Sequence, residues 1–274
     1  MNLAELIQKY RTMGYNYADA SAQVCQDILL YKISNTRFGR NITIKGGVVM
    51  HSISHDLRRA TRDLDLDFIK YSLADVYIYK FIDTLNTTND NIKIEITGEI
   101  EELRQQDYHG KRVHLKLTDD LGYSITTKLD IGVEKNFDEE QEEFCFNLDV
   151  LGKNANLLIN SPEQIFTEKL KSLLKLGLQS SRYKDLLDFY YLITENKLNK
   201  DKLYLCIVKI IYNDDNMREN NIGDIIKRLS TVFYSPRYKN NLTDSKVNWL
   251  DVSVDDAINL VMNYVEELNR VTIS

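Results

Sequence analysis

The stretch from residue 63 to 68 alternates aspartate with large apolar side chains. Asp63, Asp65 and Asp67 are separated by two leucines and followed by a phenylalanine. This two-residue period is that of a β-strand with one buried face, so the three carboxylates are expected together on the other face. Neighbouring aspartates repel one another unless a cation lies between them. Magnesium is the cation that this pattern favours, because it binds one or two carboxylates together with substrate phosphate oxygens.

The segment before this strand predicts a turn without side chains. Residues 42–44 are expected to form a short strand, Gly46-Gly47 a turn, and Val48 the start of a helix. Such a junction lets backbone N–H groups approach a phosphate. A Gly-Gly pair alone also fits an ordinary tight turn. Its combination with Arg59 and Thr61, at fixed offsets before the aspartates, favours a nucleotide and metal site.

These residues carry a family resemblance. Lys45-Gly46-Gly47 with Arg59-x-Thr61-x-Asp63-x-Asp65 resembles the nucleotidyltransferase-like AbiEii/AbiGii toxin family, the toxins of bacterial abortive-infection toxin–antitoxin systems. That family belongs to the DNA polymerase β-type nucleotidyltransferase superfamily. The resemblance implies that the glycine turn holds nucleotide phosphates and that Asp63 and Asp65 hold Mg²⁺. Many relatives have Ser or Thr directly after Gly-Gly, whereas this chain has Val48, which leaves phosphate binding to the backbone, Ser52 or Lys45.

A third carboxylate is expected on a neighbouring strand. Alternation over residues 123–133 places Asp130 on the face opposite Leu129 and Ile131. A site with two metal ions needs a bridging set of ligands, and the resemblance implies this role for Asp130. An edge-strand aspartate in water is the alternative interpretation. Glu134, just past the strand, is a further candidate.

Composition bounds the remaining possibilities. The chain has 274 residues, is 43% hydrophobic and carries a formal net charge of −6, so contact with RNA would require a local basic patch. The three cysteines are widely spaced, which argues against disulfides or a zinc site. No stretch approaches membrane-spanning length and the N-terminus does not resemble a signal peptide, so we expect a cytoplasmic protein.

Hydrophobic periodicity predicts mixed elements first and helices afterwards. Helices are expected at 3–11, 17–34 and from Ser72, and strands at 92–96, 113–117, 123–133 and 144–150. Ser161-Pro162 marks the start of a helix that runs through Leu176. Further helices are expected at 182–194, 200–212, 222–233 and 254–268.

Two of these later helices carry polar residues that packing does not require. The resemblance implies that Lys169, and a segment with Lys184 and Asp185, close over the nucleotide from the helical part of the chain. A lysine suits this task because its long side chain carries a compact charge to phosphate oxygens. Asp185 and Asp188 lie one turn apart and would orient a lysine, cap the site near the metal ions, or form surface salt bridges.

We therefore predict an α+β protein with two domains. Residues 1–157 would form a nucleotidyltransferase lobe with a mixed, largely antiparallel sheet, and residues 158–274 an all-helical lobe. The expected catalytic residues are Asp63, Asp65, Asp130 and Lys169, and the nucleotide-binding residues are Lys45, Gly46, Gly47, Lys169, Lys184 and Asp185.

The predicted activity is Mg²⁺-dependent transfer of a nucleotide from an NTP. The resemblance implies an RNA acceptor, most simply the 3′ end of a tRNA, and a cognate antitoxin as partner. Two alternatives stay open at this point. One is an NTP-binding switch that transfers nothing, and the other is transfer to a protein or a small molecule. The sequence does not indicate the oligomeric state.

Overall fold

The computed structural model describes residues 1–103, 110–133, 141–244 and 246–270. The chain divides into two compact units, Met1–Asn160 and Ser161–Ser274. The sequence placed this boundary between residues 157 and 158, whereas the last strand of the first unit continues to Ile159. Each unit is described by itself below.

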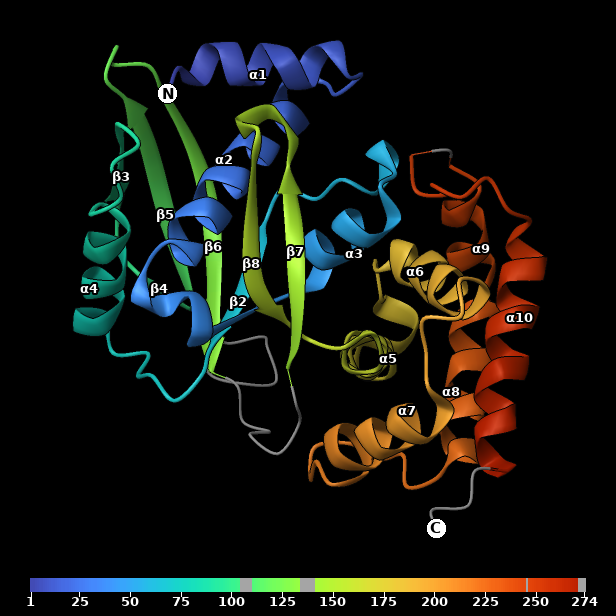
Figure 1. The fold of residues 1–274 in the computed structure, drawn as a ribbon. Coiled ribbons are helices and arrows are strands. Elements are labelled where there is room, and N and C mark those ends of the chain that lie inside the picture. Colours follow the sequence, from blue (N-terminus) through green and yellow to red (C-terminus); the bar gives the residue numbers. More distant parts are fainter. Residues whose placement is uncertain (104–109, 134–140, 245, 271–274) are drawn as a thin grey trace. The chain divides into compact units, whose positions relative to one another are not determined.

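The first unit is built on one mixed sheet (Figure 1). In the described residues the strand order is β3-β5-β6-β2-β1-β8-β7, and β4 pairs with β5 beside β3. The strands are β1 (Ile42–Lys45), β2 (Leu64–Phe68), β3 (Ile92–Ile96), β4 (Glu101–Leu103), β5 (Gly110–Asp119), β6 (Ser124–Val133), β7 (Glu142–Leu148) and β8 (Lys153–Ile159). Among the strand pairs formed by the described residues, β1–β8 and β2–β6 are parallel and the others are antiparallel. The prediction of a mixed, largely antiparallel sheet is confirmed.

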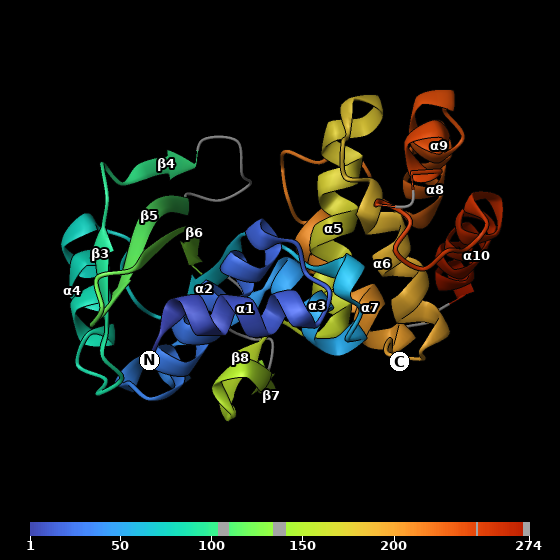
Figure 2. The same ribbon diagram turned by 90° about the horizontal axis from the view of Figure 1, so that it is seen from above.

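In the part of the first unit that the structure describes, four α-helices accompany the sheet. They are α1 (Leu3–Thr12), α2 (Tyr17–Ser34), α3 (Gly46–Ser54) and α4 (Asp75–Leu85). The long helix α2 packs on β6 and β8, α3 packs on β1 and β2, and α4 packs on β3. Seen from above, β4 lies beside β5 (Figure 2). The expected helix from Ser72 begins only at Asp75, because the Ser72 hydroxyl accepts the amide of Ala74 in the preceding loop.

The apolar side of β2 is fixed by a cluster of aromatic rings. Phe68 lies 5.3 Å from Phe81 of α4 and 5.2 Å from Tyr71, both edge-to-face between ring centroids. Phe38 stacks on Phe68 at 6.4 Å and also lies edge-to-face against Tyr71 and Phe81. Leu64, Leu66 and Phe68 are fully buried. Since the side-chain period of a strand is two, this anchoring directs the alternating aspartates to the opposite face.

Strand β8 is an element that the sequence analysis missed. Its alternating residues Ala155, Leu157 and Ile159 are buried, which is a strand pattern, but the segment begins with the polar residues Lys153 and Asn154. It pairs with β7 on one side and with β1 on the other. β8 therefore supports β1, the strand that leads into the glycine turn.

The second unit is helical throughout its described part. Its helices are α5 (Pro162–Leu176), α6 (Tyr183–Thr194), α7 (Lys200–Ile207), α8 (Ile222–Phe233), α9 (Pro236–Leu242) and α10 (Val254–Glu267). The Ser161 hydroxyl accepts the Gln164 amide at 3.2 Å, so the predicted cap of α5 is confirmed. In neither unit do the described residues include a helix that is long and apolar enough to cross a membrane.

Two details of the second unit differ from the expectation. The predicted helix over 200–212 ends as an α-helix at Ile207 and continues as a π-helical turn, Val208–Tyr212. The Asn213 amide donates to the Val208 carbonyl, the fifth-neighbour bond that defines this geometry. Helix α9 was not predicted, although Ser235 caps it and Pro236 begins it.

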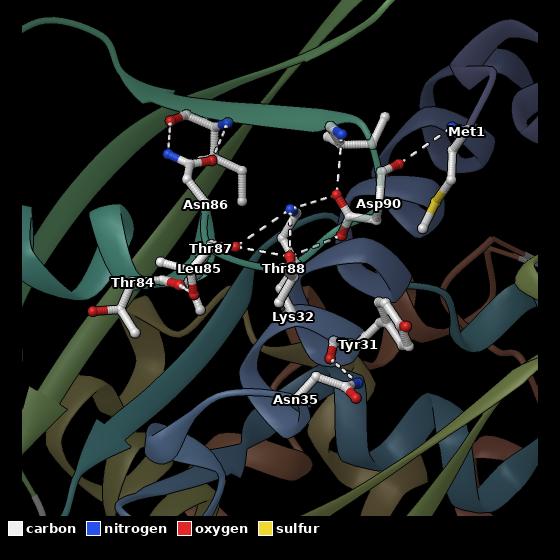
Figure 3. Close-up of polar contacts among 12 residues, drawn as sticks. Met1, Tyr31, Lys32, Asn35, Thr84, Leu85, Asn86, Thr87, Thr88 and Asp90 are labelled. Carbon is white, nitrogen blue, oxygen red and sulfur yellow. Dashed lines mark hydrogen bonds and ion pairs between the residues drawn. The ribbon is translucent and has the colours of Figure 1, made fainter.

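A buried ion pair joins α2 to the turn between α4 and β3 (Figure 3). The Lys32 ammonium lies 2.7 Å from Asp90 Oδ1 and donates to Thr88 Oγ1 at 2.8 Å, with both charged side chains almost fully buried. Asp90 Oδ1 also accepts the Ile92 amide at 3.0 Å, at the start of β3. The Lys32–Asp90 pair therefore joins the start of β3, a strand at the edge of the sheet, to helix α2.

Lys32→Met should lower the free energy of unfolding of the protein by about 3 to 5 kcal/mol, because it leaves Asp90 as a buried charge without its cation. Urea unfolding followed by circular dichroism measures the loss. Arg62→Met is the matched control, since Arg62 pairs with Asp19 at the surface, and it should change stability by no more than about 0.5 kcal/mol. Equal losses of unfolding free energy in the two variants would show that the buried Lys32–Asp90 pair stabilises the protein no more than a surface pair does.

Candidate active site

Four charged residues form one row across the open face of the sheet. Arg112 on β5 is the register partner of Asp130 on β6, Asp130 is the partner of Asp65 on β2, and Asp65 is the partner of Lys45 on β1. Register partners on adjacent strands point to the same face of a sheet. The predicted juxtaposition of Asp65 and Asp130 is therefore present, with a cationic residue at each end of the row.

Asp130 is bound at both oxygens by Arg112. The guanidinium Nε donates to Oδ1 and Nη2 donates to Oδ2, each at 2.8 Å. This bidentate pair raises the pKa of the Arg112 guanidinium, chiefly through its hydrogen bond to Asp130. Asp130 is buried, and the Arg112 side chain keeps 29% of its surface exposed. The third carboxylate is thus held in place by an arginine rather than lying in water.

Lys45 and Asp67 form a second buried pair on the same face. The Lys45 ammonium lies 2.7 Å from Asp67 Oδ1, and both side chains are less than a tenth exposed. Asp67 lies two residues beyond Asp65 along β2, so the Lys45 side chain reaches diagonally past its own register partner. Lys45, proposed from the sequence as a phosphate ligand, neutralises an aspartate in this structure.

The glycine turn lies directly against the aspartate strand. Gly46 has φ of 70°, and a methyl group there would come within 2.7 Å of Asp65 Oδ2. A methyl group on Gly47 would come within 2.9 Å of the Thr61 side chain. Helix α3 begins at Gly46 itself, two residues earlier than expected, and its N-cap residue Lys45 gives no side-chain cap. The glycine pair and the Thr61–Asp65 segment, which are separate motifs in the sequence, thus lie close together in the fold.

Two carboxylates at the start of β2, Asp63 just before the strand and Asp65 within it, are the candidate ligands for a divalent cation. Asp63 is exposed and Asp65 half-buried, two residues apart on one face. Mg²⁺ needs only one or two carboxylates when phosphate oxygens and water complete its octahedron, so this pair fits one such ion. Within the described ranges, no group of three or more His, Cys, Asp or Glu residues is arranged to hold a metal ion. Asp63, Asp65 and Asp130 are thus not assembled here as a three-ligand site.

The helical unit places its predicted residues in a cluster of their own. Lys169 on α5 lies 2.7 Å from Asp185 Oδ1 and 2.9 Å from Asp188 Oδ2, both on α6. All three side chains are less than a tenth exposed. Arg182 lies 3.4 Å from the other oxygen of Asp185, at the start of the same helix. Of the roles considered for Asp185 and Asp188, orientation of Lys169 is the one that this geometry shows.

Lys184 and Glu134 were also predicted as site residues. Lys184 lies half-buried in the first turn of α6, beside Asp185 in the sequence. Glu134, named as a further carboxylate beyond β6, lies outside the described residues. The cap expected from Ser161 and the helix around Lys169 are both present, so the lysine lies on a rigid helix and not in a loop.

Arg112 is the site residue that sequence analysis missed. The predicted strand began at residue 113, but extending the alternation of Val113, Leu115 and Leu117 back by one residue would have placed Arg112 on the polar face. What the sequence did not supply was the register of β5 on β6, which pairs Arg112 with Asp130. A register shift of one residue would have directed the arginine to the other face.

Gly46→Ala should destabilise the protein by about 1 to 3 kcal/mol more than Gly122→Ala, because the added methyl group overpacks against Asp65. Gly122 is the matched control: its φ is 82°, so alanine is equally strained there, yet a methyl group would meet nothing within 4 Å. Urea unfolding of both variants gives the difference. Indistinguishable losses would mean that backbone conformation alone requires glycine at position 46.

Comparison with known proteins identifies the family of the chain. The comparison with curated proteins found no significant match. Among solved structures, the chain is similar to an antigenic nucleotidyltransferase-like protein from Paracoccidioides brasiliensis, with 18% identity, a TM-score of 0.42, and coverage of 78% of this chain and 97% of that chain. A family profile described as nucleotidyl transferase AbiEii toxin, type IV toxin–antitoxin system, matches residues 28–253. The chain belongs to the AbiEii nucleotidyl transferase toxin family and is a nucleotidyltransferase.

Proposed function

We propose that this nucleotidyltransferase transfers a nucleotide from an NTP to an RNA acceptor, the 3′ end of a tRNA, in a Mg²⁺-dependent reaction. Blocking that end would stop translation and growth. The observation that carries the metal and nucleotide part is the contact between the glycine turn and Asp65, beside Asp130 on the next strand. The tRNA acceptor follows from family membership and from the fact that a 3′ terminus offers a free hydroxyl.

Asp63 and Asp65 are the proposed Mg²⁺ ligands, and the turn at Gly46-Gly47 is the proposed phosphate cradle. When bound, Mg²⁺ neutralises charge on the triphosphate and favours departure of pyrophosphate. The absence of a side chain at Gly46 keeps Asp65 in its place and leaves the start of α3 open to an anionic group. Val48 is buried, so its side chain contributes nothing polar there.

Asp130 is proposed to align the acceptor hydroxyl. It is the neighbour of Asp65 in the parallel pair β2–β6, so a group bound at Asp65 lies beside it. Lys169, Lys184 and Asp185 are proposed to contribute to NTP binding from the helical unit. The two aspartates that pair with Lys169 fix the position of its ammonium group.

The family implies an antitoxin partner, and we propose that the toxin acts in the cytoplasm, where its RNA acceptor is found. A switch that binds NTP without transfer is the competing function. A second competitor is transfer to a protein or small molecule.

Labelled-nucleotide transfer separates these functions. The protein is incubated with each of the four NTPs, labelled at the α-phosphate, and with total RNA or total protein, in Mg²⁺ or in excess chelator. Label on RNA of tRNA size, lost after removal of the 3′ nucleotide and absent with chelator, is the expected result. Label on protein would overturn the acceptor assignment, and binding without any transferred label would favour the switch.

Asp65→Asn should abolish transfer and toxicity while the fold persists, because the amide keeps the size of the side chain but removes the charge that binds a hard cation. Transfer of label and growth after induction measure the effect. Asp83→Asn, an exposed aspartate on α4 of the same unit, should behave as wild type. Wild-type toxicity of Asp65→Asn at equal expression would remove the metal assignment.

Lys169→Met should weaken NTP binding about tenfold or more, since a charge-assisted hydrogen bond contributes about 1.5 to 3 kcal/mol. Isothermal titration calorimetry measures the affinity. Lys171→Met is the matched control, because Lys171 lies on the same helix in a similarly buried pair with Asp214, at 2.6 Å. If both variants lose the same affinity, the effect comes from loosening of α5 and not from a phosphate contact.

A further inference from the structure

We propose that Arg112 competes with divalent cations for Asp130, so that this carboxylate enters metal coordination only when the guanidinium leaves it. This inference rests on the proposed Mg²⁺-dependent function and adds a positioning residue to it. It starts from the row on the sheet face, in which Arg112, Asp130, Asp65 and Lys45 are register partners in turn.

The first step is the saturation of Asp130. Each of its two oxygens accepts an N–H of Arg112 at 2.8 Å, which is the bidentate geometry that arginine makes with carboxylates. A cation approaching Asp130 from the side of Asp65 meets oxygens already bound to a positive group. Like charges at such short range oppose each other, so the pair lowers the affinity of Asp130 for a second cation.

The second step is that Arg112 is able to leave. Its side chain is 29% exposed, against 8% for that of Asp130, so the guanidinium lies on the accessible side of the pair. Two other carboxylates act electrostatically on it, Asp63 and Glu101, the latter its register partner on β4. Because Asp63 is itself a proposed metal ligand, the anionic neighbour to which the guanidinium can turn is Glu101, whereas Asp130 is fixed in the middle of the sheet.

The third step compares the two ends of the row. Lys45 is buried with Asp67, at 7% and 5% side-chain exposure, and that pair has no exposed member. The Lys45–Asp67 pair is thus closed off from solvent, whereas in the Arg112–Asp130 pair the arginine is accessible and able to move away. If one cation is bound at Asp63 and Asp65, a second cation can therefore bind Asp130 only after Arg112 has moved away.

The test measures Mn²⁺ binding to the full chain without nucleotide, by electron paramagnetic resonance of free Mn²⁺. Arg112→Gln should bind Mn²⁺ about tenfold more tightly than wild type, or gain a further equivalent, which is the scale on which residues contacting metal ligands alter metal affinity. Adding Asp130→Asn to Arg112→Gln should remove the gain. Lys116→Gln is the matched control, because Lys116 lies on the same face of β5 and pairs in register with Thr126, away from Asp130.

Arg112→Lys supplies a second variant, since it keeps the charge but cannot bind both oxygens of Asp130, and it should show a smaller gain. The shift of the thermal unfolding midpoint with added Mn²⁺ gives the same comparison in a different readout. Mn²⁺ binding to Arg112→Gln and Arg112→Lys equal to that of wild type would overturn the proposal, as would an equal gain in Lys116→Gln.

Failure of the proposed function looks different. If the wild-type protein with NTP binds no Mn²⁺, and Asp65→Asn leaves transfer and toxicity unchanged, the proposed Mg²⁺-dependent reaction is wrong. If wild type with NTP binds Mn²⁺ through Asp65 but the arginine variants gain nothing, only the competition at Asp130 is excluded.

Discussion

Two aspartates placed side by side on adjacent parallel strands create the constraint on which the site depends. Asp65 and Asp130 are register partners, and like charges directly opposite destabilise a sheet. Arg112, the register partner beyond Asp130, binds both oxygens of that carboxylate, and Lys45, the register partner beyond Asp65, pairs with Asp67 on the same face. The strand order β5-β6-β2-β1 brings these four register partners into line, although the first and last of them, Lys45 and Asp130, are far apart in the sequence.

The parts of this arrangement that a sequence can predict are the local ones. The alternation around Asp65 fixed the face of the carboxylates because Leu64, Leu66 and Phe68 had to be buried, and they are. The Ser161-Pro162 pair predicted the start of α5 for a similarly local reason. Strand pairing is not local. The parallel pair β1–β8 joins residues more than a hundred positions apart, and the polar start of β8 hides its strand pattern.

The same distinction explains the misses in the helical unit and at the sheet edge. Ser235-Pro236 repeats the capping signal of Ser161-Pro162, but α9 has only seven residues and too few turns to show a hydrophobic period. Arg112 was visible as a polar residue on an alternating strand, yet its role depends on the register of β5 on β6. Lys45 was expected beside phosphate, and the structure adds an ion pair of its ammonium with Asp67 on the neighbouring strand β2, which the sequence did not indicate.

Neutralisation inside the protein changes how a cation binds to such a site. In an uncompensated cluster of aspartates, the first cation would be held mainly by relief of repulsion. Here Asp67 is paired with Lys45 and Asp130 with Arg112, whereas Asp63 and Asp65, at the start of β2, are the more exposed aspartates. A methyl group on Gly46 would meet Asp65 at this same place. A cation bound at Asp63 and Asp65, as proposed, would therefore lie beside the glycine turn, where a triphosphate would supply the oxygens that two carboxylates alone lack.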